Sequence, residues 1–158
     1  MKIIVNADDC GMSALVNSHI ENAIQNRKIT STTVMANMDD LEGAKRLYET
    51  YKDTISFGLH MNLTQGHPLL YSQSLLDCGC YKEGENGICF NGYAFMRRFL
   101  NRSCCEDILK ELQAQANVLR DNQIAISHID SHHHIHTAFF MMGILPKLSK
   151  SINVYKGY

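Results

Sequence analysis

The sequence predicts an α/β protein in which helices cover a parallel sheet. Segments typical of short buried strands alternate with segments of helical periodicity along most of the 158 residues. Such alternation requires crossover connections, which make neighbouring strands parallel and place helices against the sheet. Apolar residues make up 45% of the chain, which is typical of globular proteins, and the length fits one domain. We therefore interpret residues 1–158 as a single domain.

The first part of the chain contains three predicted strands separated by two helices. Ser13 is placed to cap the first helix, whose apolar positions form one stripe as far as about Asn26. Asp39 or Asp40 is placed to cap the second helix. The strands are short runs rich in apolar or β-branched residues. They are residues 2–7, 29–36 and 54–60.

Residues 61–91 interrupt this order. They contain several glycines and have weak periodicity, which predicts a long loop or insertion of the kind that often serves as a lid or binding loop. A short helix is expected near residues 93–100. Ser103 and Glu106 then form a capping box that starts a helix running to about Asp121.

Two further strands are predicted towards the end of the chain, which makes about five in all. One is residues 124–130, IAISHID, and the other is residues 152–158, INVYKGY. The helix expected between them, over residues 138–150, contains Pro146, which predicts a break or a kink.

Residues of metal-ligand type follow three of the predicted strands. Asp8 and Asp9 end the first strand, His60 ends the third, and the fourth leads through Asp130 into the histidine run 132–136. Because the carboxyl ends of parallel strands share one rim, these side chains are expected to meet. One carboxylate and two imidazoles are a common ligand set for a catalytic divalent ion. A second carboxylate beside the first is suited to act as general base.

Each of these features also has a plainer interpretation. Two acids after a strand often mark a turn or a helix cap, and a single histidine at a strand end is usually structural. The run SHHHIH is also compatible with an exposed loop that binds metal ions loosely. The position of all three features at strand ends favours the metal site. The chain has no GxGxxG, P-loop or GxSxG motif, so nothing supports a nucleotide site or a serine hydrolase.

Charge and cysteine usage exclude several other classes. Fifteen basic and sixteen acidic residues give a net charge of -1 without a long like-charge run, which argues against nucleic-acid or membrane-surface binding. The N-terminus lacks the apolar run of a signal peptide, and no stretch approaches the length of a membrane span. We expect a cytoplasmic protein with reduced thiols. A structural zinc site at Cys78, Cys80 and Cys89 is the alternative.

Four motifs, VNADDCGMS, ITSTTVMAN, FGLHMNLTQGHPL and HIDSHHHIH, occur in this order over nearly the whole chain. Together they resemble the YdjC-like carbohydrate deacetylases, best known as chitooligosaccharide deacetylases. The resemblance implies a modified (β/α) barrel and a divalent metal ion, Zn²⁺ or Mg²⁺ first, then Co²⁺ or Mn²⁺. It implies removal of acetyl groups from N-acetylglucosamine units of short oligosaccharides. A full barrel needs about 250 residues, so this chain would form an incomplete barrel-type fold of about five strands.

The resemblance also implies roles for individual residues. Asp8 corresponds to the general base, and Asp9, His60 and His132 correspond to the metal ligands. Four further polar residues correspond to supporting or substrate-rim positions. They are His128, Asp130, His134 and His136. Cys10 stands where the family usually has phenylalanine, which we interpret as a packing change.

One departure from the family pattern keeps other functions open. The family's later motif, a histidine next to proline that is thought to be the general acid, has no match here. The alternatives are therefore a non-catalytic metal- or sugar-binding module and a metal hydrolase of another amide or ester. An incomplete barrel exposes strand edges and apolar surface, which predicts a homodimer or larger oligomer.

Overall fold

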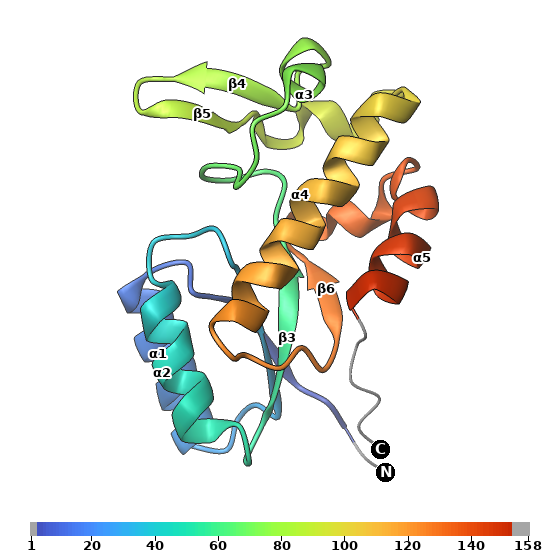
Figure 1. Cartoon of the computed structure of the whole chain (residues 1–158). Helices are drawn as coiled ribbons and strands as arrows, with labels where there is room; N and C mark the ends of the chain where they lie inside the picture. The colour runs from blue at the N-terminus through green and yellow to red at the C-terminus, as the bar shows by residue number, and fades with distance from the viewer. Residues whose placement is uncertain (1–2, 153–158) are drawn as a thin grey trace.

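The computed structural model describes residues 3–152 and is built on a parallel sheet (Figure 1). The four strands are β1 (Asn6–Cys10), β2 (Ser31–Val34), β3 (Ser56–Met61) and β6 (Ile129–Ser131), in the order β1-β2-β3-β6. The predicted α/β class is confirmed. Of the strand predicted over residues 152–158, Ile152 ends a helix and the rest lies outside the described residues.

Four helices surround this sheet: α1 (Ala14–Gln25), α2 (Leu41–Tyr51), α4 (Arg102–Asp121) and α5 (Met141–Ile152). Ser13 and Asp40 cap the first two helices as predicted, since their side chains accept backbone N–H bonds of the first turns. The prediction that Ser103 caps α4 was wrong. The cap is Asn101, two residues earlier, and its side-chain oxygen accepts a hydrogen bond from Cys104 N at 2.8 Å. Pro146 lies inside α5 and does not end it.

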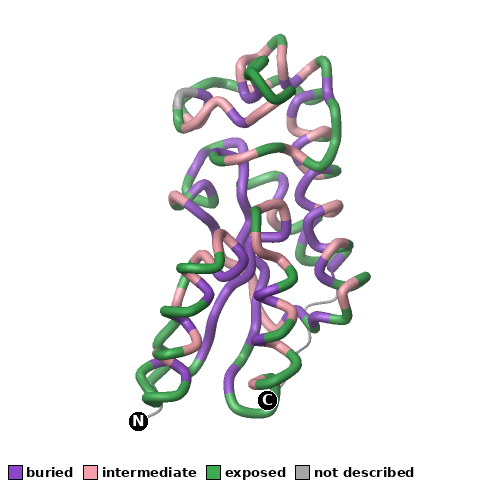
Figure 2. Tube along the Cα trace, turned by 90° about the vertical axis from the view of Figure 1, so that its left-hand side faces the viewer, coloured by how far each residue is buried: buried purple, intermediate pink, exposed green. Residues whose placement is uncertain are grey.

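The sheet has an apolar face and a polar face. Phe57 and Leu59 of β3 are buried in the core that the helices cover, and Tyr48 of α2 meets Phe57 edge-on with ring centroids 5.1 Å apart. Buried residues follow the strands and the inward sides of the helices (Figure 2). The polar face is formed by residues that alternate with these apolar ones along β3, and by residues of the other strands that pair with that second set in register. They are Asn6, Ser31, Thr33, His60 and Asp130.

The first strand begins later than predicted. Ile3, Ile4 and Val5, expected within a buried strand, precede β1 and are exposed because no described element covers them. Within the described part of the chain, β1 and β6 each pair on one side only. The same part of the chain contains no helix that is long and apolar enough to cross a membrane.

The segment predicted as a long loop is more ordered than its composition suggests. It contains a short helix, α3 (Gln73–Asp77), and an antiparallel hairpin of β4 (Tyr81–Gly84) and β5 (Gly87–Phe90). A 3₁₀ helix, η1 (Gly92–Arg97), follows where a short helix was expected. The helix α3 and the hairpin were missed because each of these elements has only four or five residues, too few for a periodic hydrophobic pattern to be recognised. Residues 62–97, which include these elements, are called the inserted segment below. The segment lies beyond the carboxyl end of β3 (Figure 1).

Buried polar residues of α4 hold the start of this segment against the sheet. Gln115 accepts from Asn62 N at 3.0 Å and donates to Asn62 O at 2.7 Å. Oε2 of Glu111 accepts a hydrogen bond from Leu69 N at 3.0 Å, and Oε1 of Glu111 accepts one from Gln115 Nε2 at 2.9 Å. Since both side chains are fully buried, these bonds fix the path of the chain directly after β3.

Candidate metal centre

An irregular step at the end of β1 turns two consecutive acids towards one site. The pairing register with β2 shifts between Ala7 and Cys10. Asp9 lies in this step with a φ of 67°, a left-handed conformation that aspartate tolerates better than most residues. In a regular strand, neighbouring side chains point to opposite faces. Here Asp8 and Asp9 both have a carboxylate oxygen within 4.8 Å of a nitrogen of His60.

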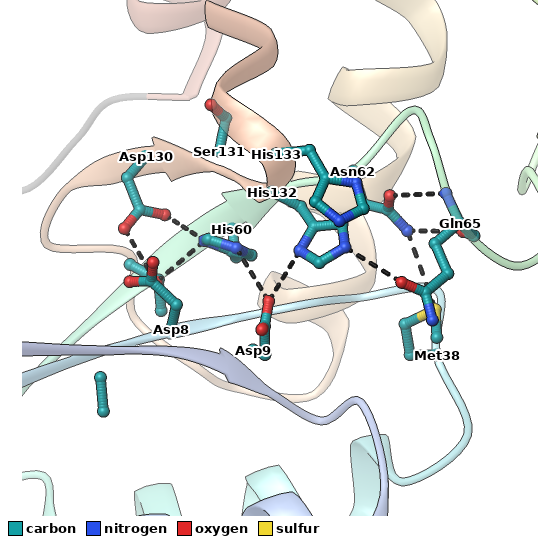
Figure 3. A network of polar contacts seen from close by, with 12 residues as sticks. Asp8, Asp9, Met38, His60, Asn62, Gln65, Asp130, Ser131, His132 and His133 are labelled. Atoms are coloured by element: carbon teal, nitrogen blue, oxygen red, sulfur yellow. Dashed lines mark hydrogen bonds and ion pairs between the residues drawn. The ribbon is translucent and has the colours of Figure 1, made fainter. Parts of the chain in front are cut away.

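Asp9 lies between two buried histidines that come from other parts of the sheet (Figure 3). Its Oδ1 is 3.1 Å from Nε2 of His60 and 2.8 Å from Nδ1 of His132. His60 belongs to β3, and His132 begins η2 (His132–Thr137) directly after β6. The side chains of both histidines are less than a tenth exposed, whereas that of Asp9 is 32% exposed. The cluster is therefore embedded in the protein on one side and open on the other.

Asp130 orients His60 from behind. An oxygen of Asp130 is hydrogen-bonded to Nδ1 of His60, and its second oxygen accepts from Thr33 Oγ1 at 3.0 Å and Asn6 Nδ2 at 3.1 Å. A carboxylate that holds one ring nitrogen of a histidine leaves the other nitrogen directed at the metal and raises its basicity. Of the two positions considered for Asp130, supporting or substrate-rim, these contacts favour the supporting one, which stays a prediction.

The same contacts set the protonation of the cluster. Burial opposes a charge on His60, but the hydrogen bonds to Asp130 and Asp9 outweigh it and raise the pKa of His60 to about 9. Hydrogen bonds from His132 and His60 hold the pKa of the Asp9 carboxyl well below its usual range. Without an ion, His60 is therefore a cation at neutral pH, and a metal ion must displace its proton.

Asp8 lies beside this cluster and is exposed. Its Oδ1 accepts a hydrogen bond from Asn6 Nδ2 at 2.8 Å. Asn6 also donates to Asp130, so one amide positions both the outer carboxylate and the one behind His60. An exposed carboxylate next to the buried ligands is in the place that a general base for water requires.

The segment after β3 completes the rim of the site. Oε1 of Gln65 lies 3.1 Å from Nε2 of His132, on the ring edge opposite Asp9. The side chain of Asn62 accepts from the backbone N–H of Gln65 at 3.1 Å and donates to its carbonyl at 2.7 Å. The buried contacts of α4 with Asn62 thus reach the metal centre through Gln65.

Three of the predicted site residues lie away from the cluster. The ring of His128 lies between the hydroxyls of Ser31 and Ser127, and burial lowers its pKa. The backbone turns through two left-handed residues, His133 and His134, and both His134 and His136 are exposed. Neither contributes to the described metal-ligand groups. The histidine run therefore supplies one buried candidate ligand, His132, because the turn leaves His134 and His136 facing solvent.

Sequence reasoning missed several residues around the centre. Asn6 carried a usable signal, since it stands two residues before Asp8 and hence on the same strand face. Thr33 lies on the polar face through its register with Gly58 of β3, which is known only once the strands are aligned. Gln65 belongs to the segment predicted as a loop and carried no signal.

The cysteines form no metal site of the kind considered above. All six are free thiols. The sulfur atoms of Cys78 and Cys80 are 3.2 Å apart, but Cys89 faces the carbonyl of Lys82 instead. Cys10 is completely buried, and burial raises its pKa to about 12, in keeping with a packing role.

The donor set fits a divalent metal ion. One ligand atom each from Asp9, His60 and His132 lies within 4.8 Å of the other two. Carboxylate oxygen and imidazole nitrogen suit Zn²⁺ and also Co²⁺, Mn²⁺ or Mg²⁺. Three protein ligands leave coordination positions for water and substrate. A second group, Asp8, His60 and Asp130, is less suited because Asp130 is already bonded to His60, Thr33 and Asn6.

The fold and this centre define an α/β domain with a candidate metal site at the carboxyl end of a parallel sheet. Residues 2–154 match the family model described as YdjC-like protein. The chain belongs to the YdjC-like family, so the resemblance drawn from its motifs is confirmed.

Similar proteins include carbohydrate deacetylases of several bacteria. The chain is 32% identical over 155 residues to that of Clostridium beijerinckii, covering 98% of this chain and 58% of the relative. It is 41% identical over 135 residues to that of Geobacillus stearothermophilus, covering 84% and 49%. A crystal structure from Enterococcus faecalis, described as a candidate cellobiose-phosphate cleavage protein, superposes with a TM-score of 0.74 at 26% identity, covering 96% and 56%. The chain thus spans between 49% and 58% of the length of these proteins, as a partial barrel-type fold.

Asp130→Asn is expected to weaken metal binding without unfolding the chain. An amide in place of the carboxylate no longer fixes His60, and loss of such a supporting carboxylate costs about 10- to 100-fold in affinity. Calorimetric titration of chelator-treated protein with Zn²⁺ measures the change. Asp121→Asn, at an exposed acid at the end of α4, is the matched control and should bind as the wild type does. Equal affinity of Asp130→Asn and wild type would contradict the orienting role.

The affinity for Zn²⁺ is expected to rise with pH through the range in which His60 is protonated. Because its pKa is raised to about 9, each ion displaces one proton below that pH. Affinity should therefore increase about tenfold per pH unit between roughly pH 7 and pH 8.5. Titrations in buffers of different ionisation enthalpy count the protons released. A constant affinity with no proton release would show that His60 is already neutral in the metal-free protein, contrary to the raised pKa.

Proposed function

We propose that the chain acts as a metal-dependent hydrolase that removes N-acetyl groups from N-acetylglucosamine-containing oligosaccharides. The observation that carries this proposal is the meeting of Asp9, His60 and His132 at the open end of the sheet, with Asp8 beside them. Membership of the YdjC-like family, whose named relatives here are carbohydrate deacetylases, supports the substrate class. Because the chain spans 58% of the length of such a relative, the experiment has to measure whether this chain by itself releases acetate.

The residues suit hydrolysis of an amide. A divalent ion held by Asp9, His60 and His132 would supply Lewis acidity towards the acetyl carbonyl and the attacking water. Asp8, as general base, takes a proton from the water while the water oxygen forms a bond to the carbonyl carbon. The C–N bond then breaks, and the proton held by Asp8 passes to the nitrogen of the departing sugar amine. One water thus yields acetic acid and a neutral amine, and at neutral pH the proton of the acid also ends on the amine, giving acetate and an ammonium group.

The supporting residues keep these groups in place during the reaction. Asn6 donates to Asp8 and Asp130 together, which fixes the base relative to the orienting carboxylate. Gln65 borders His132 on the side away from Asp9. Positioning of this kind accounts for much of the rate enhancement of enzymes, since it removes the need to orient the groups at each turnover.

Asp8→Asn is expected to abolish acetate release from N,N′-diacetylchitobiose while Zn²⁺ binding persists. The amide preserves the shape of the side chain and removes its basicity, and loss of a general base costs about 10²- to 10⁴-fold in rate. Acetate is measured enzymatically on metal-loaded protein, and bound Zn²⁺ by calorimetry. Asp39→Asn, at an exposed acid of the next strand–helix connection, is the control.

Two outcomes would contradict the proposal. Wild-type turnover by Asp8→Asn would show that another group is the base. Absence of acetate release by the metal-loaded wild type, with hydrolysis of a simple acetyl ester retained, would identify a metal hydrolase of a different acyl substrate.

A further inference from the structure

An exposed aromatic ring, that of Tyr93, lies close to the candidate metal centre without belonging to its ligand group. Tyr93 belongs to η1, the last element of the inserted segment, and its side chain is 55% exposed. Its ring centroid is 4.4 Å from that of His133, with 39° between the ring planes. A large ring that is supported on one side and open to solvent elsewhere presents a flat apolar surface to a ligand.

His133 connects this ring to the centre. Its ring centroid is 3.7 Å from that of the ligand His132, with 34° between the planes (Figure 3). Nδ1 of His133 is hydrogen-bonded to Thr64 Oγ1 at 2.9 Å. Its backbone adopts a left-handed φ of 55°, a conformation that few residues other than glycine adopt. The strained turn places the ring of His133 between those of His132 and Tyr93.

The three rings form a continuous series from a metal ligand to solvent. His132 is nearly buried, His133 is half-buried and Tyr93 is exposed. Two close steps separate the metal ligand from the exposed ring. An extended molecule whose reacting group lies at Asp9 and His132 therefore has an aromatic surface for its neighbouring unit.

We propose that Tyr93 is the stacking platform for a second pyranose unit, the one adjacent to the unit whose N-acetyl group reacts. The inference rests on the proposed function and adds to it the residue that holds the second sugar unit. The C–H groups on one face of a pyranose ring are apolar and pack against an aromatic ring. Such contacts give affinity without a fixed hydrogen-bond pattern, which suits a unit that does not react.

The test compares binding of one and two sugar units to the Zn²⁺-loaded chain by calorimetry. The wild type should bind N,N′-diacetylchitobiose more tightly than N-acetylglucosamine. Tyr93→Ala should weaken disaccharide binding about tenfold and leave monosaccharide binding unchanged. Tyr93→Phe should bind both as the wild type does, since the ring remains. Tyr71→Ala, at another exposed tyrosine of the inserted segment, is the matched control and should change neither.

Each other outcome overturns the platform. Unchanged disaccharide affinity in Tyr93→Ala, or equal loss for both sugars, would show that Tyr93 holds no second unit. Absence of sugar binding to the wild type would do the same. The proposed function is tested separately by acetate release: binding that depends on Tyr93 without release would sustain the platform and refute the deacetylase.

Discussion

The shared contact of Asp9 with His60 and His132 is the interaction on which the rest of the site depends. It joins residues that are up to 123 positions apart in the chain. It exists because β1 ends in a register shift and Asp9 adopts a left-handed conformation there. Had β1 continued regularly, Asp8 and Asp9 would point to opposite faces of the sheet. The irregular step at Asp9 therefore brings two neighbouring acids of one strand to the same site, Asp9 as a candidate ligand and Asp8 as a candidate base.

The polar face of the sheet supports this contact. Asn6 and Thr33 donate to Asp130, which in turn holds His60. Because these side chains are polar, leaving this face of the sheet in contact with water costs little free energy, whereas leaving an apolar face exposed would cost more. The described chain also exposes apolar side chains, among them Ile3 and Ile4 before β1 and Phe99 and Phe139 beside α4 and α5.

Much of the fold and the centre of the site could be predicted because both depend on periodic features. The strand–helix alternation predicted the sheet, and ligand types at strand ends predicted that the two acids, His60 and the histidine run would meet. The family resemblance then singled out Asp9 and His132 among them. The hairpin in the inserted segment escaped prediction because its strands have four residues each. The contacts of Gln65 with His132 and of Tyr93 with His133 join parts of the chain that are far apart in sequence, so they leave no local pattern. The outward turn after His132 likewise depends on two unusual backbone conformations.

Zn²⁺ binding to chelator-treated wild type and His132→Ala, followed by calorimetry, tests the central claim most directly. The account predicts one ion per wild-type chain and a loss of at least about 100-fold in affinity when the imidazole is removed. Circular dichroism establishes that both proteins are folded. The account would be contradicted by a folded wild type that binds no Zn²⁺, or by His132→Ala that binds it as tightly as the wild type.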